Sequence, residues 1–191
     1  MTSRKPVLLL DLDGVVNSFS VKPPKYAWPA AEWKTGSAVS LDKEYPLLWS
    51  TAVVGILNAL HWEGNGKVEV RFHTSWQADA WNFADVVGLY RFPIQPCPEY
   101  PTGMESEGEL IAARLRDGLP GWWKYFAAER VLAEERRPLI WVDDDITWEL
   151  PRVRRDRMAQ LGEVLLISPD KYTGLMPKHF KLIDEFVKEV A

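Results

Sequence analysis

Acidic and hydroxyl residues follow three apolar runs that lie far apart in the chain. Asp11 and Asp13 come after the first run, Thr74 and Ser75 after the second, and Asp143–Asp145 after the third. Carboxylates brought together without compensation repel one another and raise each other's pKa, which a bound divalent cation relieves. Hard oxygen ligands that leave positions open for water and phosphate suit Mg²⁺. These residue types therefore predict a magnesium site that binds a phosphate group, if the fold brings the three groups together.

The segments that carry these residues are predicted to alternate between strands and helices. Strands are expected over Val7–Leu10, Lys67–His73, Phe92–Ile94, Pro138–Val142 and Val164–Ile167. Helices are expected over Pro46–Trp62, Gln77–Val87, Glu109–Arg116, Trp122–Glu135, Pro151–Leu161 and Met176–Val190. This alternation predicts an α/β fold, a three-layer Rossmann-like parallel sheet of about five strands with helices on both faces. Ligands bind such sheets at the carboxyl ends of the strands, where the acidic groups are expected.

The length of 191 residues fits a single domain over residues 1–191. Residues 15–45 are predicted to form a flap or small lid after the first strand, because Val15–Trp33 contains three prolines and reads as an irregular loop or short hairpin. Four aromatic residues crowd this loop, namely Phe19, Tyr26, Trp28 and Trp33. No insertion is long enough for a large separate cap domain, so an open site is expected.

The composition is that of a globular protein, with 47% hydrophobic residues and a formal net charge of −4. This charge predicts no strong general attraction to nucleic acid or to anionic membranes. The basic start, Met1–Lys5, is followed by an apolar run too short for a signal peptide or a membrane span. The one cysteine, Cys97, cannot form an internal disulfide, which suits a reducing compartment. A cytoplasmic location without a membrane partner is therefore expected.

The short motifs, taken together, resemble those of the haloacid dehalogenase-like (HAD) hydrolases, in the same order along the chain. They are Asp11-x-Asp13-Gly14-Val15, Thr74, Lys124 and the pair Asp143-Asp144. The resemblance implies a phosphatase in which Asp11 attacks phosphorus and Asp13 serves as general acid and base. A carboxylate nucleophile of this kind divides one displacement into two easier steps. DxDG alone is weak support, and the run fails as a calcium loop because Lys22 stands where a closing Glu would be needed.

The same resemblance implies roles for the remaining motif residues. Thr74 would hydrogen-bond a phosphoryl oxygen, and Lys124 would neutralise the phosphoryl group and the nucleophile. Mg²⁺ would bridge Asp11, the backbone carbonyl of Asp13 and Asp144. Asp143 would be a second ligand or would lie just behind the ligands.

Several assignments stay open at the level of sequence. Ser75 is an alternative to Thr74, Arg114 is an alternative to Lys124, and Asp145 is a spare third acidic residue. Gly14, Ser75 and Trp28 are further candidates for contact with the substrate. His73 adjoins Thr74, but a structural role at the end of a strand is the preferred interpretation. No phosphate-binding P-loop, dinucleotide fingerprint, zinc-protease motif or cysteine-phosphatase signature occurs in the chain.

The expected activity is hydrolysis of a phosphomonoester through an aspartyl-phosphate intermediate. A phosphorylated small molecule, a nucleotide or a nucleic-acid terminal phosphate is the expected substrate, because an open site with an aromatic flap suits a base or a chain end. Two alternatives stay open: a catalytically silent binding or regulatory module of the same fold, and a phosphotransferase to an acceptor other than water. The sequence predicts no oligomeric state.

Overall fold

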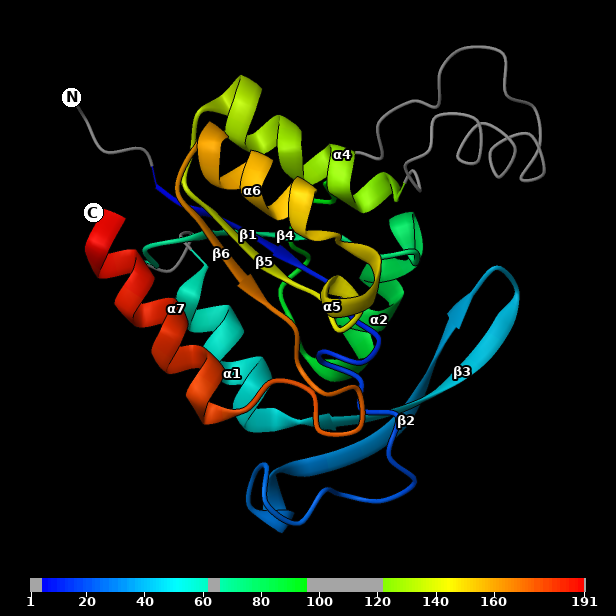
Figure 1. The fold of residues 1–191 in the computed structure, drawn as a ribbon. Helices are drawn as coiled ribbons and strands as arrows, with labels where there is room; N and C mark the ends of the chain where they lie inside the picture. Colours follow the sequence, from blue (N-terminus) through cyan, green and yellow to red (C-terminus); the bar gives the residue numbers. More distant parts are fainter. Residues whose placement is uncertain (1–4, 62–65, 96–121, 191) are drawn as a thin grey trace.

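The computed structural model describes residues 5–61, 66–95 and 122–190, and it has an α/β architecture (Figure 1). The strands are β1 (Val7–Leu10), β2 (Trp33–Ser40), β3 (Lys43–Ser50), β4 (Glu69–Phe72), β5 (Leu139–Val142) and β6 (Val164–Ile167). The helices are α1 (Thr51–Leu60), α2 (Ala80–Val87), α4 (Trp123–Arg130), α5 (Ile146–Glu149), α6 (Arg152–Leu161) and α7 (Pro177–Val190). Short 3₁₀ turns lie at η1 (Ala30–Glu32) and η3 (Gln77–Asp79), and a π-helical turn, η4 (Val131–Glu135), continues α4.

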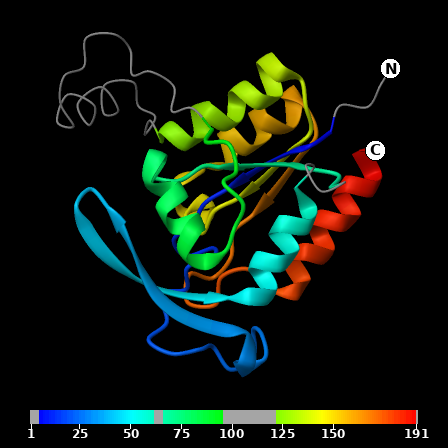
Figure 2. The same cartoon turned by 180° about the vertical axis from the view of Figure 1, so that it is seen from behind.

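The central strand β1 is buried on both faces, as its unbroken apolar sequence predicts. Leu8 and Leu10 belong to a core shared with α1, α2 and α7, whereas Val7 and Leu9 belong to a core shared with α4 and α6. Successive side chains of a strand point to opposite faces, so one short run of leucine and valine supports both layers of helices. Figures 1 and 2 show α1 and α7 on one face of the sheet and α4 and α6 on the other.

The sheet is parallel throughout and has the order β4-β1-β5-β6. Leu10, the last residue of β1, lies opposite Phe72 of β4 and Val142 of β5. The residues that follow these three strands therefore begin at the same edge of the sheet. This register places Asp11, which follows β1, beside Asp143, which follows β5. The segment that contains Thr74 follows β4, on the other side of β1.

The sheet has four strands where the sequence predicts about five, because Phe92–Ile94 does not form a strand. A single bridge joins Ile94 to Phe72, in which the backbone N–H of Phe72 donates to Pro93 and the N–H of Gln95 donates to Phe72. Pro93 has no N–H group to donate, so it cannot extend a ladder of hydrogen bonds.

The two-stranded hairpin β2–β3 corrects the prediction of a helix that begins at Pro46. Lys43–Ser50 pairs with Trp33–Ser40, and α1 begins only at Thr51. Leu47 and Trp49 pack into the main core, whereas Leu48 packs against Ala27 and Trp33. That alternation is the period of a strand, and Pro46 is tolerated because each strand of a two-stranded ribbon has one unpaired edge. The flap therefore extends past residue 45 as a long hairpin at the carboxyl edge of the sheet (Figures 1 and 2).

The other predicted helices that fall within the described residues are present with small changes at their ends. Gln77–Val87 begins with the 3₁₀ turn η3, Trp122–Glu135 ends with the π-helical turn η4, and α5 was not predicted. The predicted helix Glu109–Arg116, Arg114 within it, and Cys97 lie outside the described residues. Within the described ranges, no helix is both long and apolar enough to cross a membrane.

Candidate functional site

A buried lysine joins two aspartates at the carboxyl edge of the sheet. The Nζ atom of Lys124 lies 2.8 Å from Oδ2 of Asp11 and 2.7 Å from Oδ2 of Asp143. Asp11 is 6% exposed and Asp143 is fully buried. The two aspartates directly follow the paired strands β1 and β5, and Lys124 lies in the first turn of α4. The structure thus brings together three of the site residues that the sequence predicts.

Backbone donors fix the two aspartates in place. The N–H of Leu12 donates to Oδ1 of Asp11 at 2.9 Å, and the N–H of Asp145 donates to Oδ1 of Asp143 at 3.0 Å. Both oxygens of each aspartate accept a hydrogen bond, but none of the surface of Asp143 is exposed. Asp11 keeps a small exposed surface, which makes it the better placed of the two to meet a substrate.

Asp144 completes a group of three carboxylates that could hold a metal ion. Oxygen atoms of Asp11, Asp143 and Asp144 lie within 4.8 Å of one another. One ammonium group against three carboxylates leaves excess negative charge that a divalent cation would balance. The ligands are all carboxylate oxygens, the type that Mg²⁺ prefers, so these residues fit such an ion. Asp145 is not part of the group.

The ionisation of the cluster reflects its burial and crowding. Burial raises the pKa of Asp11, although Lys124 opposes the shift. Burial, with the charge of Asp11, raises the pKa of Asp143 to about 8. Burial and the charge of Asp145 raise the pKa of Asp144 to about 6. Burial alone would lower the pKa of Lys124, but the two aspartates that it contacts raise it above its usual value. The lysine is therefore charged at neutral pH, whereas burial and crowding favour the protonated forms of the carboxyl groups.

Gly14 makes room for Asp144. The backbone of Gly14 has φ +71°, and a Cβ atom built there would lie 2.4 Å from Cγ of Asp144. A side chain at this position would be strained in the left-handed region and would also displace the carboxylate. The glycine of the DxDG motif thus acts here through the space that it leaves for a candidate ligand.

If the three carboxylates hold Mg²⁺, replacing Gly14 by alanine is expected to weaken its binding at least about tenfold, because Asp144 must move. Calorimetric titration of the variant with Mg²⁺ measures the effect. Gly55→Ala is the matched control, since nothing lies within 4 Å of a Cβ atom built at Gly55 in α1. Alanine in a helix interior is stabilising by about 0.5–1 kcal/mol relative to glycine, so this control should bind Mg²⁺ normally and melt at a slightly higher temperature. Undiminished Mg²⁺ affinity in Gly14→Ala would show that Asp144 is not a ligand.

Asp13 is not one of the three clustered carboxylates and has partners of its own. The side-chain amide of Asn17 donates to Oδ1 at 2.8 Å, and the indole N–H of Trp76 donates to Oδ2 at 2.8 Å. The carboxylate of Asp13 is not among the three clustered ones, so any metal contact through this residue would have to come from its backbone carbonyl, as the sequence predicts.

The loop after β4 distinguishes Thr74 from Ser75. Thr74 is buried and its hydroxyl hydrogen-bonds to Asp11, whereas Ser75 is exposed. The next residues turn sharply: Gln77 has φ +46°, a left-handed conformation that costs about 1 kcal/mol or more for a residue with a side chain. Its amide and its backbone N–H both donate to the carbonyl of Thr74, which holds the turn. Of the two residues, Thr74 is the one that the fold brings to Asp11.

His73 is buried directly behind the site and packs among aromatic rings. Its ring centroid lies 5.2 Å from that of Trp123 and 5.5 Å from that of Trp141. Burial, together with the nearby charge of Lys124, lowers its pKa well below the usual value, so the ring is neutral. This packing agrees with the structural role that the sequence favours.

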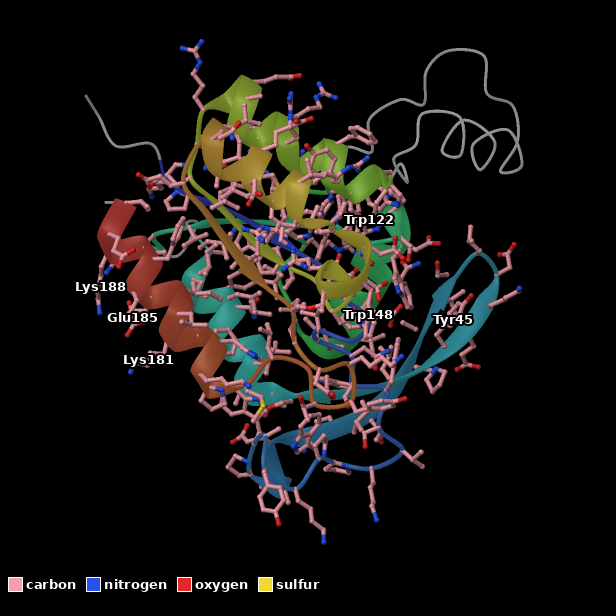
Figure 3. The ribbon with its side chains drawn as sticks, in the orientation of Figure 1. Tyr45, Trp122, Trp148, Lys181, Glu185 and Lys188 are labelled. Carbon is pink, nitrogen blue, oxygen red and sulfur yellow. The ribbon has the colours of Figure 1, made fainter. Side chains whose placement is uncertain are left out.

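Trp28 is committed to packing in the loop before the hairpin. Its indole N–H donates to the carbonyl of Leu175 at 2.8 Å, and its ring lies against Phe180 of α7. The ring of Trp33 is buried beside it. No described contact joins Trp28 to the carboxylates. Tyr45 on the hairpin and Trp148 on α5 are exposed aromatic side chains (Figure 3).

Asn17 and Trp76, which donate to Asp13, are not among the site residues predicted from the sequence. Asn17 lies four residues after Asp13 and Trp76 lies two residues after Thr74, so both adjoin a recognised motif. Nothing in the residue types identifies them, since asparagine is common in loops and tryptophan is common in cores.

Comparisons of the chain with protein-family models, with curated proteins and with solved structures found no match in any of the three. Function must therefore be inferred from the chemistry of the site.

Proposed function

We propose that the chain is a Mg²⁺-dependent phosphomonoester hydrolase that acts through an aspartyl phosphate on Asp11, as the motifs that resemble HAD hydrolases imply. The observation that supports this most is the buried arrangement of Asp11, Lys124 and Asp143 at the carboxyl edge of a parallel sheet, with Asp13 held separately beside it. A purely structural ion pair between Lys124 and the two aspartates would not need Asp144 as a third clustered carboxylate. It would also not need the separately held carboxylate of Asp13.

Asp11, Asp143 and Asp144 are the residues that would hold the metal. When bound, Mg²⁺ offsets the repulsion between an anionic nucleophile and an anionic phosphate. The chain contributes the fixed cation Lys124 to the same end, at contact distance from the nucleophile.

The first chemical step belongs to Asp11. A carboxylate oxygen forms a bond to phosphorus while the bond from phosphorus to the leaving oxygen breaks. The N–H of Leu12, the hydroxyl of Thr74 and Lys124 hold the carboxylate in one orientation, so little rearrangement is needed before attack. Asp13 donates a proton to the leaving oxygen, which departs as an alcohol.

The second step regenerates the enzyme. Asp13, now ionised, takes a proton from a water molecule. The oxygen of that water attacks phosphorus, and the bond from phosphorus to Asp11 breaks. Inorganic phosphate leaves and Asp13 is again protonated. One residue can serve both steps because Asp13 is not one of the clustered carboxylates and is held by two neutral donors, Asn17 and Trp76.

Release of phosphate from an aryl phosphate, in Mg²⁺ and in EDTA, tests the proposal directly. We expect turnover in Mg²⁺ and none in EDTA, and beryllofluoride should be trapped on Asp11. Nucleotides head the panel of natural substrates, because the exposed rings of Tyr45 and Trp148 can stack on a base. A folded, Mg²⁺-binding protein that neither turns over any phosphomonoester nor traps beryllofluoride would contradict the proposal and favour a binding module.

Binding of Mg²⁺ is expected to strengthen as pH rises from about 5.5 to about 8. The raised pKa values of Asp144, about 6, and Asp143, about 8, mean that protons compete with the metal over this range. The affinity should change up to about tenfold per pH unit for each proton displaced. Titration calorimetry in buffers of different ionisation enthalpy measures the protons released, and a dissociation constant that is constant across the range would refute the expectation.

The same shifts predict how metal-free stability depends on pH. A carboxyl whose pKa is higher in the folded than in the unfolded protein binds more protons when folded, so stability falls as pH rises from about 4 towards the folded pKa. Saturating Mg²⁺ should remove much of this decline.

A further inference from the structure

The carboxylate of Asp13 is held by one neutral donor on each oxygen. Asn17 donates to Oδ1 and Trp76 donates to Oδ2, each at 2.8 Å. A carboxylate has about four acceptor positions, so this arrangement fixes the plane of the group and leaves positions open for a proton. Neither donor carries a charge, so the carboxylate is oriented by hydrogen bonds to neutral groups.

Both donors are themselves tied to the hairpin β2–β3. The side-chain oxygen of Asn17 accepts the backbone N–H of Leu48 in β3 at 2.9 Å. The ring of Trp76 packs against Tyr45 of the same strand, with ring centroids 5.5 Å apart, and also against Phe83 of α2. Tyr45 is 39% exposed, and its partner across the hairpin is the small residue Ala38, so part of the ring stays uncovered. Figure 3 shows Tyr45 on the hairpin, on the opposite side of the molecule from α7.

We propose that Trp76 and Asn17 are positioning residues that hold Asp13 for proton transfer and couple its orientation to the hairpin. This inference rests on the proposed function, because it assigns Asp13 the proton that the leaving oxygen takes. Movement of Tyr45 or Leu48 when a substrate contacts the hairpin would reach Asp13 through one aromatic contact and one hydrogen bond. The hairpin is then part of the catalytic geometry as well as a cover for the site.

Trp76→Phe tests the proposal, because it removes the indole N–H while keeping an aromatic ring against Tyr45 and Phe83. The variant is compared on two substrates, an alkyl phosphate, whose leaving oxygen needs a proton, and p-nitrophenyl phosphate, whose leaving group needs none. We expect kcat/KM for the alkyl phosphate to fall roughly 10- to 100-fold, the range for loss of a hydrogen bond to a charged group. For p-nitrophenyl phosphate kcat/KM should stay within about threefold, whereas kcat should fall because Asp13 also activates water in the second step.

Two further variants sharpen the test. Trp81→Phe is the matched control: its indole N–H donates to the carbonyl of Phe92 and its ring is partly exposed, so both substrates should behave as with the wild type. Tyr45→Ala should reproduce the selective loss on the alkyl phosphate to a smaller extent. If it has no effect while Trp76→Phe does, the coupling to the hairpin is overturned.

A ¹⁵N–¹H spectrum of the indole groups supplies a measurement that does not depend on turnover. The signal missing in Trp76→Phe identifies Trp76, and that signal should shift in Asp13→Asn and stay in place in Asp85→Asn. If the wild type is active and Trp76→Phe loses kcat/KM equally on both substrates, or loses none, the positioning role alone is overturned. A folded wild type that turns over no phosphomonoester and traps no beryllofluoride would overturn the proposed function, and this inference with it, even if the indole signal shifts.

Discussion

Asp11→Asn is expected to lower kcat by about 10³-fold or more, because an amide oxygen cannot attack phosphorus as a carboxylate does. The substitution keeps the shape of the side chain and an oxygen that can accept the N–H of Leu12. Lys124 retains Asp143 as a partner, so no buried charge is left without compensation. Turnover of p-nitrophenyl phosphate at saturating Mg²⁺ measures the effect.

Stability distinguishes loss of the nucleophile from loss of the fold. Burial raises the pKa of Asp11, so the ionised side chain is held in the folded protein at a cost that asparagine does not carry. The free energy of unfolding of the metal-free variant should therefore stay within about 1 kcal/mol of the wild type.

The matched control is Asp85→Asn, an exposed aspartate paired with Arg91 on the surface, which should leave kcat unchanged. If Asp11→Asn kept kcat within tenfold of the wild type, Asp11 would not be the nucleophile.

The strands that carry the site could be predicted from sequence because of where they lie. A strand buried on both faces is an unbroken apolar run, and Val7–Leu10 and Leu139–Val142 are such runs with polar residues at their ends. Once the strands are parallel, the positions of Asp11 and Asp143 at one edge follow from topology. The sequence therefore indicates which carboxylates meet, without any knowledge of their contacts.

The hairpin and the surroundings of Asp13 could not be predicted in the same way. Leu47, Leu48 and Trp49 fit a helix as well as a strand, and only their packing on two different cores decides between them. The bond from Trp76 to Asp13 joins positions 63 residues apart in the chain. Contacts of this kind depend on the exact turn at Gln77 and on the hairpin's position, which single residues do not encode.

Lys124→Met is expected to destabilise the metal-free protein by about 3–5 kcal/mol at neutral pH, since it removes the cation that two buried carboxylates share. Methionine has a similar length and no branch, so the loss of packing should be small. The raised pKa of Lys124 means that its contribution is fully present below the unfolded value near 10.5 and is lost only at higher pH. The wild type therefore keeps this contribution throughout the neutral range.

The pH dependence of Lys124→Met identifies charge as the cause. Without the lysine, the folded pKa values of Asp11 and Asp143 rise further above their unfolded values, so stability must fall more steeply as pH rises above about 4. Denaturant unfolding at pH 5 and at pH 8 should show a deficit that is much smaller at pH 5, where the carboxyls take up protons. The control Lys181→Met removes an exposed lysine on α7, paired with Glu185 at 3.8 Å (Figure 3), and should show no measurable change at either pH. A deficit equal at both pH values would mean that Lys124 acts through packing, and its proposed role beside the nucleophile would lose its electrostatic basis.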